Sequence, residues 1–458
     1  MNERKHILVL AYMLSPYKGS EFSVAWNYVT EMSKDNDLTV LYGISGKHMG
    51  DCEEMETFIK DNPIPGVNLI AVKPNGLANA LNYLNRHDIF VYTFYYAYRV
   101  WQWLAYKKAM ELMKYYDFDL IHYVGMIGYR EPGYLWKLGL PYVWGPVSGA
   151  NNAPLQLMKR MPFSGKMKQL FRNFANTLQF KYSSRLKKAL KSTDILLTAT
   201  SENHDKFLDV HGKDSICIPE NAIIGNISLN QAKFIAPDKY RLIVVGTLDA
   251  RKSVGILLEA VSLIKYKNKI LLDIVGDGPL RGILESQAKN LGINDIINWH
   301  GLLPRTKAVE LFDSAHLHVI TSVSEGNPTT IWEAMMHGVP TLSFDHCGMH
   351  DSLRDGAGIL IPIKNTYEEN IEVIVSMLDH MIENPEKFKV LAFNTLSRAK
   401  LNTWLLRRQF LNNLYTALLS DKKYEYNKKT YNEDCGNYNQ RLTRDCNPKC
   451  RLSGRPCS

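Results

Sequence analysis

The sequence predicts an α/β protein built from two doubly wound parallel sheets. Short apolar runs rich in β-forming residues alternate with longer helical stretches, and this series occurs twice along the chain. A length of 458 residues suits two large domains, and residues 219–237, which mix Asn, Gly and Pro, are a natural hinge. We therefore expect one domain over residues 1–225, a second over residues 226–420, and a ligand between them.

The expected elements follow in chain order. In the first half we expect helices at 20–34, 97–116 and 178–192, and strands at 7–13, 38–42, 67–72, 120–124, 142–144 and 195–200. In the second half we expect helices at 253–265, 280–291, 305–313, 329–337 and 368–383, and strands at 242–245, 271–275, 296–299, 317–321 and 341–344. An amphipathic helix over 394–419 should pack on one or both domains. Residues 421–458 have almost no aliphatic side chains and are predicted to be a disordered basic tail.

The positive charge is unevenly distributed. Lys and Arg (55) exceed Asp and Glu (46), and residues 132–193 hold eleven Lys and Arg but no Asp or Glu. One face of the N-terminal half should therefore be cationic, which suits nucleic acid, anionic lipid or an anionic substrate; an ordinary solvated surface is the alternative. We expect no nucleic-acid binding, because no recognition helix, zinc finger or stacking-aromatic motif is present.

Cysteine usage and hydropathy favour a cytoplasmic protein. Three cysteines are scattered, and the other four lie in the last 24 residues with a spacing that fits no standard zinc pair. Residues 7–14 are typical of a buried strand rather than a signal peptide, and no run approaches the ~18 apolar residues of a membrane span. Residues 158–174 interleave basic with apolar side chains, so we expect peripheral contact with the anionic inner face of a membrane.

The most informative segment is residues 324–334, Ser-Glu-Gly-Asn-Pro-Thr-Thr-Ile-Trp-Glu-Ala. A strand ends there, Glu325 follows, and Asn327 and Pro328 suit the N-cap and first position of a helix. The helix would place free N–H groups and the positive end of its dipole at the carboxyl edge of the sheet, where phosphate binds well. Thr329 and Thr330 add hydroxyl donors.

A second acid, Glu333, lies one helical turn beyond Thr329 on the same face. That separation suits the sugar hydroxyls of a nucleotide whose phosphates lie at the helix start, and Glu325 could meet a second sugar from the loop. The alternative is that both glutamates are ordinary acids favoured by the helix dipole.

Two other segments could bind anions. Residues 245–252 follow a strand and open a helix, and Lys252 could neutralise a diphosphate leaving group, although an exposed lysine at a helix start is the alternative. Gly19 follows the first strand and would permit close approach of the backbone to phosphate. Residues 276–279, Gly-Asp-Gly-Pro, do not have the spacing of a dinucleotide fingerprint.

Together these segments resemble glycosyltransferase family 4, whose members are retaining enzymes of the GT-B fold. The resemblance covers about residues 6–420 and rests on the glycine of the first loop, the segment from Gly246 to Lys252, residues 276–279, and above all the E-x7-E motif of Glu325 and Glu333. It implies two Rossmann-like domains that face each other across a cleft, a C-terminal crossover helix, and a reaction without a metal or cofactor.

The resemblance also implies roles for individual residues. Glu325 would contact the donor sugar, Glu333 the ribose, and Lys252 the departing phosphates. Backbone groups of the turn and helix start would bind the sugar and diphosphate, and the loops after the first strand and after residue 245 would complete the substrate site; these residues are Gly326, Asn327, Pro328, Thr329, Thr330, Gly19, Ser20, Thr247 and Arg251.

The chain departs from the family pattern at two positions. Thr247 stands where the family often has Arg, and Arg251 could compensate. His122 occupies the first position of a catalytic H-x-H motif, but Val124 occupies the second, so a core histidine is the alternative for His122. Residues 128–132 and 144–149 resemble a bacterial polysaccharide-assembly branch and should shape the acceptor side.

The resemblance implies transfer of a sugar from a nucleotide-sugar, most plausibly a UDP-sugar, to a hydroxyl of a glycan or lipid-linked acceptor in bacterial surface polysaccharide biosynthesis, with retention at the anomeric carbon. No side chain suggests itself as a nucleophile, which suits a protein that mainly stabilises charge while the acceptor attacks. An inactive glycan-binding relative and a nucleotide-sugar epimerase remain as alternatives.

Overall fold

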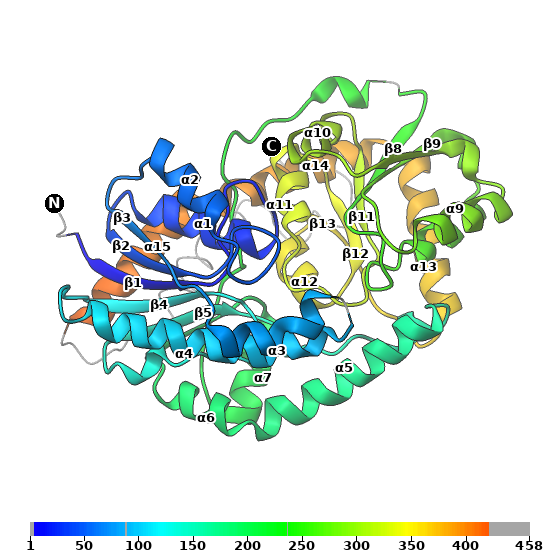
Figure 1. Cartoon of the computed structure of the whole chain (residues 1–458). Coiled ribbons are helices and arrows are strands. Elements are labelled where there is room, and N and C mark those ends of the chain that lie inside the picture. The colour runs from blue at the N-terminus through cyan, green and yellow to red at the C-terminus, as the bar shows by residue number, and fades with distance from the viewer. Residues whose placement is uncertain (1–3, 88, 236, 421–458) are drawn as a thin grey trace. The chain divides into compact units, whose positions relative to one another are not determined.

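The computed structural model describes residues 4–87, 89–235 and 237–420. Residues 1–408 belong to one compact unit, and residues 409–420 belong to a second. The first unit contains two separate parallel β-sheets with helices around them (Figure 1). The predicted tail, residues 421–458, lies outside the described residues.

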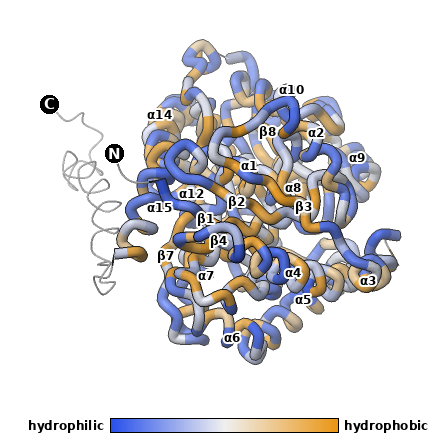
Figure 2. Tube along the Cα trace, turned by 60° about the vertical axis from the view of Figure 1, so that its left-hand side comes forward, coloured by the Kyte–Doolittle hydropathy of each residue, from blue (hydrophilic) through white to orange (hydrophobic). Residues whose placement is uncertain are grey.

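The first sheet has seven strands in the order β3-β2-β1-β4-β5-β6-β7, all parallel. The reversal of order beside β1 is the mark of a doubly wound sheet. Most of β1, β2, β4 and β5 is buried, and β1 is mainly hydrophobic in Figure 2, as strands covered on both faces should be. The strands are His6–Ala11 (β1), Asp37–Tyr42 (β2), Val67–Ala71 (β3), Leu120–Gly125 (β4), Tyr142–Val147 (β5), Ile195–Thr198 (β6) and Ile216–Cys217 (β7).

Seven helices accompany this sheet, and α3 and α4 lie side by side (Figure 1). The Asn75 side chain accepts a hydrogen bond from the Ala78 amide at 2.9 Å and so caps the start of α3. The helices are Glu21–Met32 (α1), Glu53–Asp61 (α2), Gly76–Arg86 (α3), Phe94–Leu112 (α4), Phe163–Tyr182 (α5), Ser184–Lys191 (α6) and Ser201–His211 (α7).

The second sheet has six parallel strands in the order β10-β9-β8-β11-β12-β13. Its strands are Tyr240–Val245 (β8), Ile270–Val275 (β9), Ile297–Gly301 (β10), Leu317–Ile320 (β11), Thr341–Phe344 (β12) and Gly358–Ile361 (β13). The helices are Val254–Leu263 (α8), Arg281–Asn290 (α9), Arg305–Glu310 (α10), Thr329–Met336 (α11), Cys347–Leu353 (α12), Tyr367–Glu383 (α13), Glu386–Leu401 (α14) and Trp404–Leu419 (α15). None of the described helices is long and apolar enough to cross a membrane.

Two long predicted helices are each divided in the structure. The helix expected at 178–192 breaks at Ser183, whose backbone is extended and whose side chain accepts a hydrogen bond from the Leu186 amide, so a new helix begins there. The helix expected at 394–419 breaks at residues 402–403, because the backbone on either side of the break pairs with Ile223 instead of continuing the helix. A local capping bond in the first case and tertiary hydrogen bonds in the second therefore override a continuous apolar pattern.

Each sheet packs in its own hydrophobic core, but one segment crosses between the cores. Ala153, Leu157 and Met158 precede α5 in the first half of the chain and are buried in the core of the second sheet, against Leu248 and its neighbours. Arg160 then forms an ion pair with Glu259 on α8 at 2.6 Å. The expected fold class of two doubly wound sheets is confirmed, whereas the expected boundary near residue 225 and the crossover role of the last helix stay predictions.

Candidate functional site

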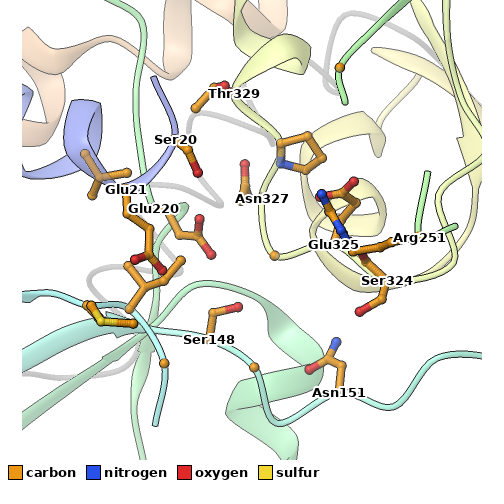
Figure 3. A pocket seen from close by; sticks show the side chains of 18 of the residues that line it. Ser20, Glu21, Ser148, Asn151, Glu220, Arg251, Ser324, Glu325, Asn327 and Thr329 are labelled. Atoms are coloured by element: carbon orange, nitrogen blue, oxygen red, sulfur yellow. Dashed lines mark hydrogen bonds and ion pairs between the residues drawn. The ribbon is translucent and has the colours of Figure 1, made fainter. Parts of the chain in front are cut away.

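A pocket of about 530 Å³ lies at the carboxyl ends of strands from both sheets (Figure 3). One wall comes from the loops after β8 and β11 and the start of α11, and the other comes from the start of α1, the loops after β4 and β5, α5 and the segment at Glu220. Ligands of open α/β sheets bind at this edge, where the loops leave the strands.

Glu325 is the central charged group of the first wall. Its Oε2 lies 2.7 Å from Arg251 Nη1, and its Oε1 lies 2.7 Å from Lys252 Nζ. Burial alone would raise the pKa of Glu325, but attraction to Lys252 and Arg251 outweighs it, so the pKa is lowered. Glu325 is therefore ionised at neutral pH, and the three side chains together carry one net positive charge.

The loop after β8 is shaped so that Lys252 can reach this cluster. Gly246 has φ of +149°, and a Cβ at that position would lie 3.0 Å from Lys252 Cε. Glycine therefore provides both the backbone conformation and the space that the lysine needs to fold back over the end of β8.

The turn before α11 differs by one residue from the expectation. The helix begins at Thr329 with Pro328 at the N-cap position, and the Asn327 side chain accepts a hydrogen bond from Trp332 Nε1 at 3.0 Å instead of capping the helix. Two buried polar atoms of this turn, Asn327 Nδ2 and Thr330 Oγ1, have no hydrogen-bond partner within the described chain. Buried polar groups are normally paired, so these two atoms are available to a ligand.

The opposite wall carries two carboxyl groups that the sequence analysis did not select, Glu21 at the start of α1 and Glu220 between the sheets (Figure 3). Burial raises the pKa of Glu21 to about 7. Burial, and then repulsion by Glu21, raise the pKa of Glu220 to about 8, and Oε1 of Glu220 has no hydrogen-bond partner within the described chain. The sequence signal for Glu220 was a pair of polar residues, Glu220 and Asn221, inside the otherwise apolar run Ile218–Ile224.

The two walls come close together at Gly326. A Cβ at this position would lie 2.4 Å from Glu220 Oε1 and 3.0 Å from Ser148 Oγ. On the other side of the turn, a Cβ at Gly348 would lie 2.2 Å from the carbonyl oxygen of Gly326. Because the close atom at Gly348 belongs to the backbone, glycine is required there, whereas a side chain at position 326 would have to displace the carboxyl group of Glu220.

The structure brings most of the predicted site residues into this pocket. They are Ser20, Thr247, Arg251, Lys252, Glu325, Gly326, Asn327, Pro328, Thr329 and Thr330. Three predicted residues are not among those that line it, namely Gly19, His122 and Glu333.

His122 and Glu333 have other partners in the structure. The rings of His122 and Tyr28 pack edge to face, His122 Nε2 lies 2.8 Å from the Gly145 carbonyl oxygen, and burial lowers the pKa of His122 to about 4. Glu333 accepts a hydrogen bond from Arg305 Nε at 2.9 Å. The catalytic role of His122 and the ribose contact of Glu333 stay predictions.

The architecture is that of the GT-B fold, and solved structures of this class share it over nearly the whole chain. The apo form of the lipopolysaccharide outer core galactosyltransferase WaaB superposes with a TM-score of 0.61 at 15% identity, over 90% of this chain and 99% of that one. HepE of Anabaena in complex with UDP and glucose superposes with a TM-score of 0.56 at 15% identity, over 90% and 100%. These similarities confirm the predicted fold.

Part of the chain is similar in sequence to a family of glycosyltransferases. Residues 227–394 match the family of glycosyl transferases group 1. A protein of Haemophilus influenzae described as an uncharacterized glycosyltransferase is 30% identical over 169 residues, which is 36% of this chain and 45% of that protein. The chain spans less than half the length of the first curated relatives that it matches. The matched residues 227–394 contain Glu325, Lys252 and the start of α11.

Proposed function

We propose that the protein is a glycosyltransferase that moves a sugar from a nucleotide-sugar, and specifically a UDP-sugar, to a hydroxyl of a glycan or lipid-linked acceptor in bacterial surface polysaccharide biosynthesis. The observation that carries this proposal is the cluster of Glu325, Arg251 and Lys252 beside the start of α11 in the pocket. The structures that resemble the chain include a lipopolysaccharide galactosyltransferase and a complex with UDP and glucose, which supports the donor and the class of acceptor.

In the proposed reaction the bond between the anomeric carbon and the diphosphate oxygen breaks, the acceptor oxygen bonds to the anomeric carbon on the same face, and the proton of the acceptor hydroxyl passes to the departing diphosphate oxygen. Lys252 and Arg251 stabilise the charge that develops on the diphosphate, together with the N-terminal end of α11. Glu325 orients the donor sugar and holds both cations in place. Retention at the anomeric carbon is part of the proposal.

The acceptor would be presented at the cytoplasmic face of a membrane by α5. Six apolar residues of this helix are between 43% and 80% exposed and recur every three or four positions, so they form one stripe: Phe163, Met167, Phe171, Phe174, Leu178 and Tyr182. Lys166 and Lys168 lie on either side of the stripe. An exposed apolar stripe with basic flanks fits the interface of an anionic bilayer.

Donor binding tests the proposed activity. A panel of nucleotide-sugars is screened by thermal shift with the wild-type protein and with Glu325→Gln, and Glu372→Gln on an exposed face of α13 is the control. We expect a shift with one or more UDP-sugars that Glu325→Gln abolishes and Glu372→Gln retains. If Glu325→Gln leaves every shift unchanged, the proposed site is wrong.

Product analysis separates transfer from the alternatives. With a radiolabelled donor and a lipid extract as acceptor, a transferase yields a labelled glycolipid, an epimerase yields an isomeric donor, and a binding protein yields neither. Flotation with vesicles of anionic and of neutral lipid tests the membrane contact. Phe171→Ser combined with Phe174→Ser should prevent flotation with anionic vesicles, and equal recovery with both lipids would contradict an anionic surface.

A further inference from the structure

The charges around the pocket do not balance, and the imbalance lies on the wall opposite Glu325. The pocket is lined by four acidic and four basic side chains: Glu21, Glu131, Glu220 and Glu325, and Arg130, Arg172, Arg251 and Lys252. By count alone the pocket would be neutral. The ion pairs of the individual groups show that a net positive charge remains.

Glu131 is neutralised by residues that do not line the pocket. Its Oε1 lies 2.7 Å from Arg99 Nη2, and its Oε2 forms an ion pair with Arg185 Nη1. The Glu131 side chain is also 6% exposed, so little of its charge reaches the cavity. Glu131 therefore does not neutralise the positive charge of the neighbouring Arg130.

The other acidic side chains do not neutralise the positive charge of this wall either. Glu325 already forms ion pairs with Arg251 and Lys252 on its own wall. The pKa of Glu21 is about 7 and that of Glu220 is about 8, so near neutral pH Glu220 is mainly protonated and Glu21 is about half protonated.

Arg130 and Arg172 consequently keep their charges. Arg130 is held by neutral amides, because its Nη2 donates to Asn176 Oδ1 at 2.7 Å and its Nε donates to Gln179 Oε1 at 3.1 Å. Arg172 lies on α5 and lines the pocket, and no carboxylate of the described residues forms an ion pair with it. Burial, and then repulsion by Arg130 and by Arg251, lower the pKa of Arg172, but a guanidinium remains charged at neutral pH.

Two partly buried guanidinium groups without a carboxylate partner are costly unless an anion joins them. Guanidinium groups match phosphate oxygens in geometry and charge, and a phosphate between the two would replace their repulsion with attraction. The neutral amides of Asn176 and Gln179 orient Arg130 without using up its charge. This arrangement is that of a prepared anion site.

We propose that Arg130 and Arg172 form a phosphate-binding subsite on the wall opposite Glu325. The inference rests on the proposed function for the source of the phosphate, which is either the diphosphate of the donor or the phosphate that joins the acceptor to its lipid. The second source fits the position of Arg172 on the pocket side of α5, the helix whose apolar stripe is exposed.

The test measures the affinity of the full-length protein for two probes, UDP and geranyl diphosphate, by titration calorimetry. Arg172→Gln and Arg130→Gln are compared with the wild type and with Lys389→Gln, which removes one positive charge from an exposed position of α14. We expect each arginine variant to raise the dissociation constant of one of the probes about tenfold or more, and Lys389→Gln to change it less than about twofold. An effect on UDP assigns the subsite to the donor, and an effect on geranyl diphosphate assigns it to the acceptor.

The stability of the unliganded protein separates binding from a structural role. Because Arg172 is repelled by its neighbours, Arg172→Gln should leave the thermal midpoint unchanged or raise it, whereas a structural arginine would lower the midpoint. Equal affinity of all variants for both probes would overturn the subsite, and so would a wild-type protein that binds neither probe. If Glu325→Gln abolishes UDP binding while both arginine variants bind normally, the subsite fails and the proposed function stands.

Discussion

Glu220 offers a direct test of the electrostatics of the pocket, because the residue is only 7% exposed and its carboxyl group lies close to Glu21 and Glu325. Its pKa is raised from 4.5 to about 8. The unfolded chain therefore releases this proton at lower pH than the folded chain does. The free energy of unfolding must then fall as pH rises from about 4.5 to about 8, and Glu220→Gln should remove this dependence because a glutamine is neutral throughout.

The magnitude follows from the size of the shift. Each pKa unit corresponds to about 1.4 kcal/mol, so above pH 8 the ionised Glu220 costs roughly 5 kcal/mol relative to a neutral side chain of the same shape. Of this cost, about 2 to 3 kcal/mol develops between pH 6 and pH 9. The variant should therefore be more stable than the wild type, with a difference that grows by that amount over this interval and then levels off.

The assay is urea denaturation followed by tryptophan fluorescence at pH 6, 7, 8 and 9, with wild type, Glu220→Gln and the control Glu372→Gln. The control replaces an exposed glutamate and should give a curve parallel to that of the wild type. If the curves of Glu220→Gln and wild type are also parallel from pH 6 to pH 9, then Glu220 is not a protonated acid in the folded protein, and the charge balance of the pocket must be revised.

Three further predictions concern the residues that shape the site. Gly348→Ala should lower the free energy of unfolding by at least about 2 kcal/mol in the same denaturation assay, because its Cβ would lie 2.2 Å from the carbonyl oxygen of Gly326. Asn221→Ala should cost about 1 to 3 kcal/mol, because it leaves the buried Nε1 of Trp404 without the acceptor now at 2.9 Å; an unchanged midpoint would contradict this role. Glu325→Gln should cost about 1 to 3 kcal/mol at pH 7, less than for a fully buried pair because one of its cationic partners is about one third exposed. Since the folded pKa of Glu325 is lowered from 4.5, this loss should disappear as pH falls through the lowered pKa, so that the two stability curves converge in acid.

The sheets were predictable because their strands are short, apolar and buried on both faces, which leaves a clear local signal. The helices around the sheets were less predictable from the sequence. The amino-terminal part of α5 was not predicted as a helix, although its apolar side chains recur every three or four positions. In the structure this apolar stripe faces outward while the polar Gln169 and Asn176 are buried, the reverse of the usual arrangement. The break at Ser183 depends on a single capping hydrogen bond that composition does not reveal.

The same contrast holds for the site. Glu325 and Lys252 lie in loops that follow strands, so the sequence indicated that each would lie near the carboxyl end of a strand, although not that they form an ion pair. Glu21 and Glu220 are about 200 positions apart, and only the tertiary fold brings both to the wall that faces Glu325. Their raised pKa values arise from burial and proximity, neither of which a single sequence can show.

The segment formed by Ala153, Leu157 and Met158 has a consequence for anyone who wishes to dissect or recombine this protein. Because these side chains are buried in the core beside the second sheet, a fragment that starts at residue 226 would lack part of its hydrophobic core. A chimaera that exchanges the carboxyl-terminal half for that of another protein of this fold would have to include the matching residues before α5 as well. Exchange of the second sheet therefore requires two segments of the chain to be replaced rather than one.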